Sequence, residues 1–393
     1  MQTRLLKNNE IQYVKNLWDY CFEKSYDAFF TWYFENYVKA ENIYGAFIGK
    51  DFAGMIHLNP YTISLNGQKL PTTYYVGVST APQHRHKGVM RALLEGSFRL
   101  LKERGQSVAI LMPVMAGIYL PYGFAYCYNK LKYQMPLDEL SRVLPITKNY
   151  EIICACEKDK KQFTDIYKQY TKKLNGYLLR ENSEWDNILG ELFTTQREGY
   201  AVFAKKGNEY CGYMLYLVKD NIFRIIELVA LDEEVKIAFL QYAAQHFSQC
   251  QDVFWHAPES DLTYLNFRLN KYYPSIQPFM MGRIIQPDKA VHDLQIPAIK
   301  GMRFDIKLTD SLIKENNAVF TLTEEKGRAK MIKSKKQKGQ LEMDIGTFAQ
   351  LCFGAFTASD LFSCGNIKTQ DDKCLDLLEK VFVEKDNYIN EYF

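Results

Sequence analysis

The chain has 393 residues, of which 47% are hydrophobic and 24% charged, and its formal net charge is +3. These values are typical of a soluble globular protein, and the length predicts two or three domains. A charge so close to neutral argues against a nucleic-acid-binding protein. The first residues lack the apolar core of a signal peptide, and no apolar run is long enough to cross a bilayer. We therefore expect a cytoplasmic location without membrane insertion.

The nine cysteines and six histidines are scattered along the chain. Cys154 and Cys156 form the only close cysteine pair, and no histidines stand at the spacing of a zinc site. We expect free thiols in a reducing compartment and no metal site.

The chain begins with two segments of helical character, 11–22 and the aromatic segment 29–38. Asp27 and Glu35 accompany the aromatic segment. They are either solvated acids beside a packed helix or part of a pocket wall that holds a cationic amine. Strand-like runs follow at 44–49 and 53–65, with an Asn-Gly turn after the second.

The segment 74–104 combines a strand, a basic loop and a helix. A valine-rich run ends at Thr80, the loop 83–88 is basic and ends in glycine, and apolar residues recur at helical spacing over 89–101. Unpaired amides at the start of a helix, together with the helix dipole, attract anions. This segment therefore predicts a site for a phosphate group.

The elements after this helix complete a first unit. The short apolar run 107–112 suggests a strand, which would make a parallel crossover with the strand before the loop. The segment 117–124 predicts a short helix or turn, and 126–135 alternates as a strand does.

Residues 149–285 repeat the order of these elements. The runs YAVFAKK and GYMLYLV match YGAFIGK and GMIHL of the first unit, and a strand at 222–231 leads to a helix over 234–247. The intervening loop, ALDEEVK, is acidic and has neither glycine nor arginine. Because carboxylates repel phosphates, we interpret the second unit as a duplicate that has lost the phosphate site.

The composition changes after about residue 286. Strands are predicted at 301–308, 318–324 and 328–334, followed by a basic loop at 333–339. The apolar segment 344–362 predicts one helix, and 375–383 another.

Two motifs of the first unit resemble those of a known superfamily. The loop resembles the acetyl-CoA pyrophosphate loop of the GCN5-related N-acetyltransferases (GNAT), and Tyr119 to Phe124, spaced Tyr-x-x-x-Gly-Phe, resembles the tyrosine motif of the same proteins. With the degenerate second copy and the third unit, the whole chain resembles the Eis (enhanced intracellular survival) acetyltransferases. One departure is Met90, where the superfamily prefers glycine or alanine.

The resemblance implies an α+β fold with tandem GNAT domains, each a mixed sheet flanked by helices. It places a catalytic GNAT domain at 1–147, a degenerate GNAT-like domain at 148–285, and a sterol-carrier-protein-like α/β domain at 286–393 whose C-terminus reaches the active site. Family members commonly form hexamers, so the resemblance also implies a homo-oligomer.

The resemblance assigns roles to individual residues. Tyr119 matches the general acid, and a phenol with a pKa near ~10 is protonated at neutral pH and can donate to the departing CoA thiolate. The terminal carboxylate of Phe393 would act as the base, although its reference pKa of roughly 3.3–3.7 requires desolvation or a bridging water. Acetyl-CoA would bind to the strand before the loop, and to the loop and helix start, through Val78, Ser79, Thr80, Arg85, His86, Lys87, Gly88, Val89, Met90 and Arg91.

The expected activity is transfer of acetyl from acetyl-CoA to a primary amine of an aminoglycoside, a polyamine or a lysine side chain. The alternative is a non-enzymatic protein that binds a lipid or peptide and senses CoA. A ribosomal or protein N-terminal acetyltransferase is disfavoured, because such chains usually have one domain.

Overall fold

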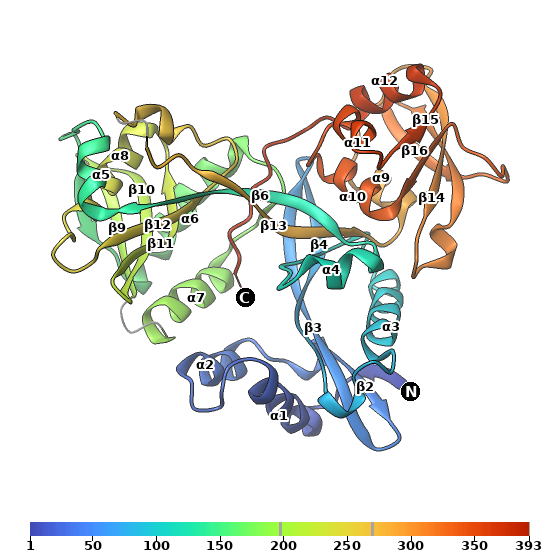
Figure 1. Ribbon diagram of the computed structural model, residues 1–393, viewed down its shortest axis with the longest axis horizontal. Coiled ribbons are helices and arrows are strands. Elements are labelled where there is room, and N and C mark those ends of the chain that lie inside the picture. Colours follow the sequence, from blue (N-terminus) through green and yellow to red (C-terminus); the bar gives the residue numbers. More distant parts are fainter. Residues whose placement is uncertain (196–198, 269–270, 393) are drawn as a thin grey trace.

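The computed structural model describes residues 1–195, 199–268 and 271–392, which form three lobes (Figure 1). The first lobe contains β1 (Gln2–Leu5), α1 (Ile11–Cys21), α2 (Ala28–Asn36), β2 (Ile43–Ile48), β3 (Asp51–Leu65), β4 (Gln68–Thr80), α3 (Val89–Glu103), β5 (Val108–Leu111), α4 (Ala116–Tyr119) and β6 (Ala125–Pro136).

The second lobe follows the same plan. It contains α5 (Leu137–Val143), β7 (Glu151–Cys154), α6 (Lys160–Tyr170), β8 (Tyr177–Leu178), α7 (Asn182–Gly190), β9 (Gly199–Lys206), β10 (Glu209–Lys219), β11 (Ile222–Ala230), α8 (Glu233–Ala244), β12 (Asp252–Ala257) and β13 (Ser275–Ile284). No helix among the described residues is long and apolar enough to cross a membrane.

The third lobe contains α9 (Pro287–Asp293), β14 (Arg303–Thr309), β15 (Ala318–Glu325), β16 (Arg328–Lys333), β17 (Leu341–Asp344), α10 (Ile345–Phe353), α11 (Ala358–Ser363), β18 (Lys368–Thr369) and α12 (Asp372–Val381). Its strands form a separate sheet in the order β16-β15-β14-β17-β18. A fully buried ion pair joins this lobe to strand β13 of the second lobe. Arg283 of β13 donates to both carboxylate oxygens of Asp310, at 2.8 and 2.7 Å.

The elements predicted from apolar periodicity are confirmed within a few residues, with two exceptions. Strand β4 begins at Gln68, six residues before the predicted start at Tyr74. The segment 344–362 is two helices and not one, because Gly354 has a φ of 68° and ends α10 in the left-handed conformation. Thr357 then caps α11 by accepting from the amide of Asp360. The apolar pattern continues through this break, so periodicity alone could not reveal it.

The first two lobes share one sheet. Its strands run in the order β1-β2-β3-β4-β5-β13-β6-β12-β11-β10-β9-β7, and β8 pairs with β3. The last strand of the second lobe, β13, is inserted between β5 and β6 of the first. Figure 1 shows β6 and β13 running together from one lobe into the other. Each lobe therefore needs strands of the other to complete its hydrogen bonding.

Two glycines at equivalent positions support the duplication. A Cβ on Gly54 of β3 would lie 2.6 Å from the Ser79 carbonyl and 2.9 Å from Val89 of α3. A Cβ on Gly212 of β10 would lie 2.6 Å from the Val229 carbonyl and 2.8 Å from Val235 of α8. The same close approach of helix to sheet thus occurs in both lobes, at glycines that stand at matching positions of the two runs.

Strands β4 and β5 pair over only a short length. They are parallel, as expected for a crossover through α3, and their pairing covers Thr73 to Tyr75 of β4. Beyond Tyr75 no strand in the described part of the chain pairs with this edge of β4. Gly77 lies at the start of the unpaired edge, with a φ of 58°, and the β3–β4 register shifts beside it. The unpaired edge leaves backbone groups of residues 76–80 available to a ligand.

Replacing Gly77 by alanine tests how closely Trp18 packs against this bulge. Its Cβ would lie 2.6 Å from the Trp18 ring, whereas at Gly67, with a φ of 71°, an added Cβ would have no atom of a non-adjacent described residue within 4 Å. Gly67→Ala should cost about 1–2 kcal/mol of unfolding free energy through backbone strain alone. Gly77→Ala should cost about 1–3 kcal/mol more, because Trp18 must move. Urea unfolding of both variants measures the difference, and equal losses would contradict the packing seen here.

Candidate active site

The basic loop leads into an uncapped helix N-terminus. Gly88 precedes α3 with a φ of 75°, His86 has a φ of 59°, and no side chain caps the first turn of this helix. Arg85, His86, Lys87 and Gly88 are exposed. Amides in such a turn have no intrahelical acceptor and point outward. The loop therefore offers amides and positive charge to an anion, although the Arg91 guanidinium is already paired with Glu95 at 2.9 Å.

The equivalent helix of the second lobe cannot do the same. The carboxylate of Asp232 accepts a hydrogen bond of 2.8 Å from the amide of Val235 and so caps α8. Glu233 and Glu234 occupy the first turn. This end of α8 is therefore capped and acidic, two features that disfavour an anion.

Tyr119 is the last residue of α4 and is largely buried on the α3 face of the sheet. Its ring packs edge-to-face on Phe124, with centroids 6.1 Å apart, and Phe124 packs on Tyr75, with centroids 5.8 Å apart. Burial raises the pKa of Tyr119, so the phenol keeps its proton at neutral pH. A protonated, partly desolvated phenol at this place is suited to donate a proton.

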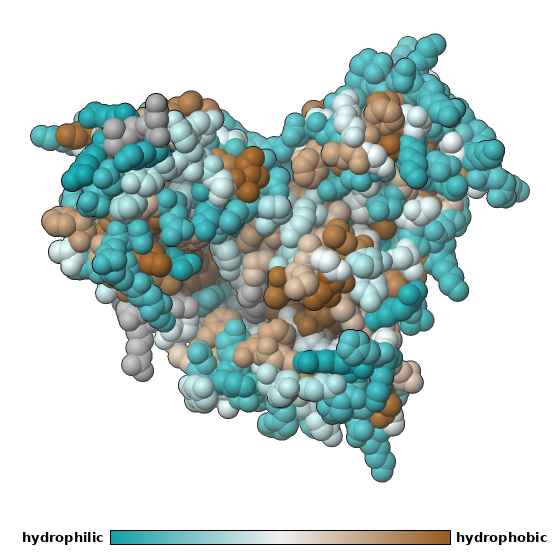
Figure 2. Space-filling view, in the orientation of Figure 1, coloured by the Kyte–Doolittle hydropathy of each residue, from teal (hydrophilic) through white to brown (hydrophobic). Residues whose placement is uncertain are grey.

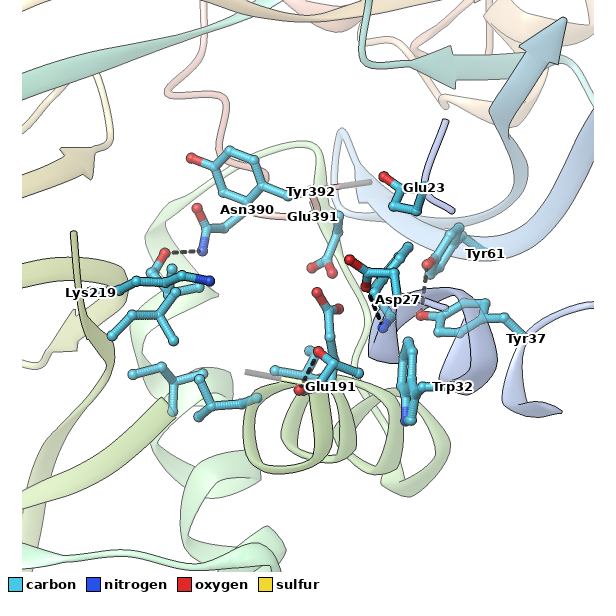
Figure 3. A pocket seen from close by; sticks show the side chains of 17 residues that line it. Glu23, Asp27, Trp32, Tyr37, Tyr61, Glu191, Lys219, Asn390, Glu391 and Tyr392 are labelled. Carbon is cyan, nitrogen blue, oxygen red and sulfur yellow. Dashed lines mark hydrogen bonds between the residues drawn. The ribbon is translucent and has the colours of Figure 1, made fainter. Parts of the chain in front are cut away.

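A cavity of about 450 Å³ lies where the first lobe, the second lobe and the C-terminal segment, residues 382–392, meet (Figure 3). Figure 2 shows the surface hollowed between these lobes. The lining is aromatic and acidic, with four carboxylates and one lysine. It consists of Glu23, Asp27, Phe29, Trp32, Tyr37, Tyr61, Ile188, Glu191, Leu192, Thr195, Leu215, Leu217, Lys219, Ile226, Asn390, Glu391 and Tyr392. Carboxylates and aromatic faces together favour a cationic ligand.

The two acids predicted to bind substrate lie in different surroundings. Asp27 lines the cavity and caps α2, since one of its oxygens accepts from the amide of Phe29 at 2.8 Å. Glu35 is exposed on α2 and is not among the residues that line the cavity. Its position agrees with the alternative interpretation, a solvated acid beside a packed helix.

Two further carboxylates face each other across the cavity. Figure 3 shows Glu191 and Glu391 pointing toward one another. Burial raises the pKa of Glu191 to about 7, and the charge of Glu391 adds to the shift. Burial also raises the pKa of Glu391, although the charge of Arg180 opposes this shift. Glu191 therefore changes charge near neutral pH, while it faces a prospective ligand.

The sequence predicted Tyr119 and Asp27 but not Glu23, Glu191 or Glu391. These acids come from a loop, from the end of α7 and from the C-terminal segment, which only folding brings together. No spacing in the sequence marks them. Phe393, the predicted base, lies outside the described residues, but its neighbours Glu391 and Tyr392 line the cavity.

Tyr119 and the acidic cavity lie on opposite faces of β4. Tyr75 packs in the cluster that contains Tyr119. The adjacent Tyr74 packs on the other face, and its hydroxyl donates to the backbone carbonyl of Glu391 at 3.4 Å. Successive residues of a strand point to opposite faces, so the two parts of the candidate site are separated by β4 itself. The unpaired edge of β4 begins directly after Tyr75.

Family models match all three lobes. An acetyltransferase (GNAT) domain matches residues 2–127, a second acetyltransferase (GNAT) domain matches 176–284, and a sterol carrier protein domain matches 287–390. The chain is thus an acetyltransferase with tandem GNAT domains and a C-terminal sterol carrier protein domain.

Comparison with individual proteins shows which acetyltransferases within this class the chain is similar to. The chain is 23% identical over 353 residues to the N-acetyltransferase Eis of Mycobacterium tuberculosis, covering 86% of this chain and 85% of that protein. It is therefore a homologue of the Eis N-acetyltransferases. In fold it resembles a GCN5-related N-acetyltransferase from Anabaena variabilis (TM-score 0.84, 22% identity) and Eis1 from Mycobacterium abscessus (TM-score 0.76, 16% identity), and each comparison covers the full length of both chains.

The affinity of the cavity for a cationic ligand should depend on pH, because Glu191 titrates near neutral pH. With a pKa of about 7, this carboxylate is mostly neutral at pH 6 and mostly ionised at pH 8. Spermine remains cationic over this range, so its affinity should rise about three- to fourfold from pH 6 to pH 8, as expected for one partly buried ion pair worth about 1 kcal/mol when Glu191 is ionised. Calorimetry without acetyl-CoA measures this change.

Two variants show whether Glu191 is responsible. Glu191→Gln should remove the pH dependence, whereas Glu35→Gln, which alters an exposed acid outside the cavity, should keep it. An unchanged pH response in Glu191→Gln would show that another group titrates.

Proposed function

We propose that the chain transfers acetyl from acetyl-CoA to a primary amine of a cationic acceptor, an aminoglycoside, a polyamine or a lysine side chain. The observation that carries this proposal is the acidic, aromatic cavity on the face of β4 opposite Tyr119. GNAT acetyltransferases use acetyl-CoA, and two GNAT models match this chain. The non-enzymatic alternative is set aside, because the relatives and domains are those of an acetyltransferase.

Acetyl-CoA is proposed to lie along the unpaired edge of β4. Residues Val78, Ser79 and Thr80 would offer backbone groups to the pantetheine arm, as an added strand does. The pyrophosphate would rest on residues 85–91, where amides and basic side chains are exposed. This placement puts the thioester near the start of the unpaired edge, between Tyr119 on one face and the cavity on the other.

Tyr119 is proposed as the general acid. The acceptor nitrogen would attack the thioester carbonyl, the carbon–sulfur bond would break, and the Tyr119 hydroxyl would protonate the departing thiolate. Its raised pKa supports this role, since the phenol is protonated before the step.

The terminal carboxylate of Phe393 is proposed as the base. It would take the proton lost by the attacking amine, directly or through a water molecule. Its proposed place is supported by Glu391 and Tyr392, which line the cavity and precede Phe393 by two residues and one residue, respectively. Asp27 would hold the charge of a second ammonium group on the acceptor.

Assembly as a homo-oligomer, with a hexamer as in the family that the sequence resembles, and a cytoplasmic location are also proposed. Light scattering on the purified full chain reports the mass of the assembly. A monomer at micromolar concentration would contradict the proposed assembly without affecting the proposed reaction.

An acetyl-CoA assay over a panel of amines tests the activity. Mass spectrometry should show the gain of one or more acetyl groups on aminoglycosides, polyamines or lysine peptides. Tyr119→Phe should lower kcat by about 10²–10⁴-fold while the KM for acetyl-CoA stays the same, because only proton donation is lost.

Tyr122→Phe is the matched control, since Tyr122 lies one turn further along and has no proposed role. It should retain the activity of the unaltered chain. Failure to acetylate any amine, together with failure to bind acetyl-CoA, would refute the proposed function.

A further inference from the structure

The C-terminal segment lies against the second lobe and against β6 of the first over several consecutive residues. Asn387 is held by the side chain of Asn175, at 2.7 Å, and donates to the carbonyl of Cys127 at 2.9 Å. The amide of Tyr388 donates to the carbonyl of Asn175 at 2.9 Å. Tyr388, Ile389 and Glu391 are buried. This segment is therefore an integral part of the interior and leads to the acidic cavity.

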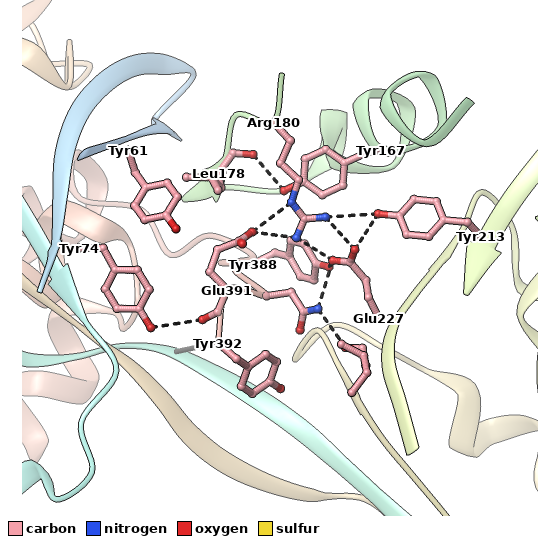
Figure 4. A network of polar contacts seen from close by, with 12 residues as sticks. Tyr61, Tyr74, Tyr167, Leu178, Arg180, Tyr213, Glu227, Tyr388, Glu391 and Tyr392 are labelled. Carbon is pink, nitrogen blue, oxygen red and sulfur yellow. Dashed lines mark hydrogen bonds and ion pairs between the residues drawn. The ribbon is translucent and has the colours of Figure 1, made fainter. Parts of the chain in front are cut away.

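Arg180, which follows β8, is the centre of the polar contacts around this segment (Figure 4). Its guanidinium is fully buried and makes two hydrogen bonds to Glu227 of β11, at 2.7 and 3.0 Å. It also donates twice to one oxygen of Glu391, at 3.1 and 2.8 Å. The rings of Tyr167 and Trp185 lie 4.3 and 5.1 Å from its central carbon. These contacts fix the orientation of the guanidinium, and two of its N–H groups donate to the C-terminal segment.

Glu227 contacts the same segment at two other residues. It accepts from the hydroxyl of Tyr388 at 2.9 Å and from the amide of Asn390 at 3.2 Å. The hydroxyl of Tyr213, on β10, donates to its other oxygen at 2.8 Å. Burial opposes its ionisation, but the charge and hydrogen bonds of Arg180 prevail and keep the pKa of Glu227 below its ordinary value. Arg180 and Glu227 together therefore hold Tyr388, Asn390 and Glu391.

Tyr392 is held separately, by the first sheet. Lys130 of β6 donates to its hydroxyl at 3.0 Å, and the ammonium lies 4.2 Å from its ring centroid. Nδ1 of His256 lies 2.7 Å from the same hydroxyl. Lys130 also donates to Asn390 at 2.8 Å. The described end of the chain is consequently held from both lobes as far as Tyr392.

Burying charges in this way is costly unless each charge is paired. Arg180 meets this condition, because it is paired with both Glu227 and Glu391. We propose that Arg180 and Glu227 are positioning residues for acetyl transfer, which act through Tyr388, Asn390 and Glu391 to hold the end of the chain in the acidic cavity. The inference rests on the proposed function, and it gives the second lobe a task in a reaction that takes place in the first.

Two buried tyrosines make a matched pair for the test. Tyr388 and Tyr213 each donate one hydroxyl to Glu227, but only Tyr388 belongs to the C-terminal segment. Tyr388→Phe and Tyr213→Phe therefore remove the same kind of bond from the same carboxylate. Arg180→Lys keeps the charge but loses the fork that contacts Glu227 and Glu391 together.

The direct readout is release of the C-terminal residues by carboxypeptidase, followed by mass spectrometry on the full-length protein. Release from a segment that opens transiently follows the population of the open form. Tyr388→Phe should release Phe393 and Tyr392 at least about tenfold faster than the unaltered chain, since it loses a hydrogen bond to a charged group. Tyr213→Phe should release them at close to the unaltered rate.

Kinetics supply the second readout. Tyr388→Phe and Arg180→Lys should lower kcat while the KM for acetyl-CoA is unchanged, because the cofactor site is intact. A purely structural role would lower the thermal midpoint and impair acetyl-CoA binding as well. If Arg180→Lys does not fold, the comparison of Tyr388→Phe with Tyr213→Phe still tests the positioning role.

Equal release and equal kcat in Tyr388→Phe and Tyr213→Phe would overturn the proposal. If the unaltered chain acetylates no amine, the proposed function fails and the positioning role in catalysis fails with it. The release rates then still support or overturn the holding of the segment itself.

Discussion

The buried pairing of Arg180 with Glu227 and Glu391 is the constraint on which the arrangement of the lobes depends. Three charged groups lie in the interior, and each would be strongly destabilising if left unpaired. The pairing is complete only when the C-terminal segment lies between the lobes. The network thus couples the position of the chain end to the correct folding of the second lobe, far away in sequence.

The continuous sheet provides the frame for this contact. Because β13 lies between β5 and β6, the edge of β5 is covered by a strand of the second lobe, and the lobes cannot separate without breaking backbone hydrogen bonds. A cavity built from both lobes can therefore keep a fixed shape. The third lobe is attached by the buried pair of Arg283 and Asp310, and its last helix leads into the C-terminal segment.

Much of the fold follows from local patterns in the sequence. The strand, basic loop and helix at 74–104 were predictable, because alternation, a glycine before the first turn and helical spacing are each local signals. The acidic start of α8 was also predictable, from the acids of its loop. The two helices within 344–362 were not, since the apolar pattern is unbroken across Gly354. The strand order could not be predicted either, because no local pattern in the sequence of β13 indicates that it pairs with β5.

The candidate site shows the same division. Tyr119 is marked by its spacing from Gly123 and Phe124, and Asp27 by its position before an aromatic helix. Glu191, Glu391 and Arg180 have no such mark, because their importance comes from burial and from neighbours more than 150 residues away. Charges that matter through tertiary contacts alone require the folded structure to be recognised.

The central claim is that the end of the chain completes the active site inside the acidic cavity. It is tested most directly by comparing turnover of the full chain with that of a chain lacking Phe393 and of one extended by a single glycine. The account predicts that both altered chains bind acetyl-CoA as the full chain does but lose amine acetylation, because the terminal carboxylate is removed or displaced. Undiminished acetylation by the extended chain would contradict it.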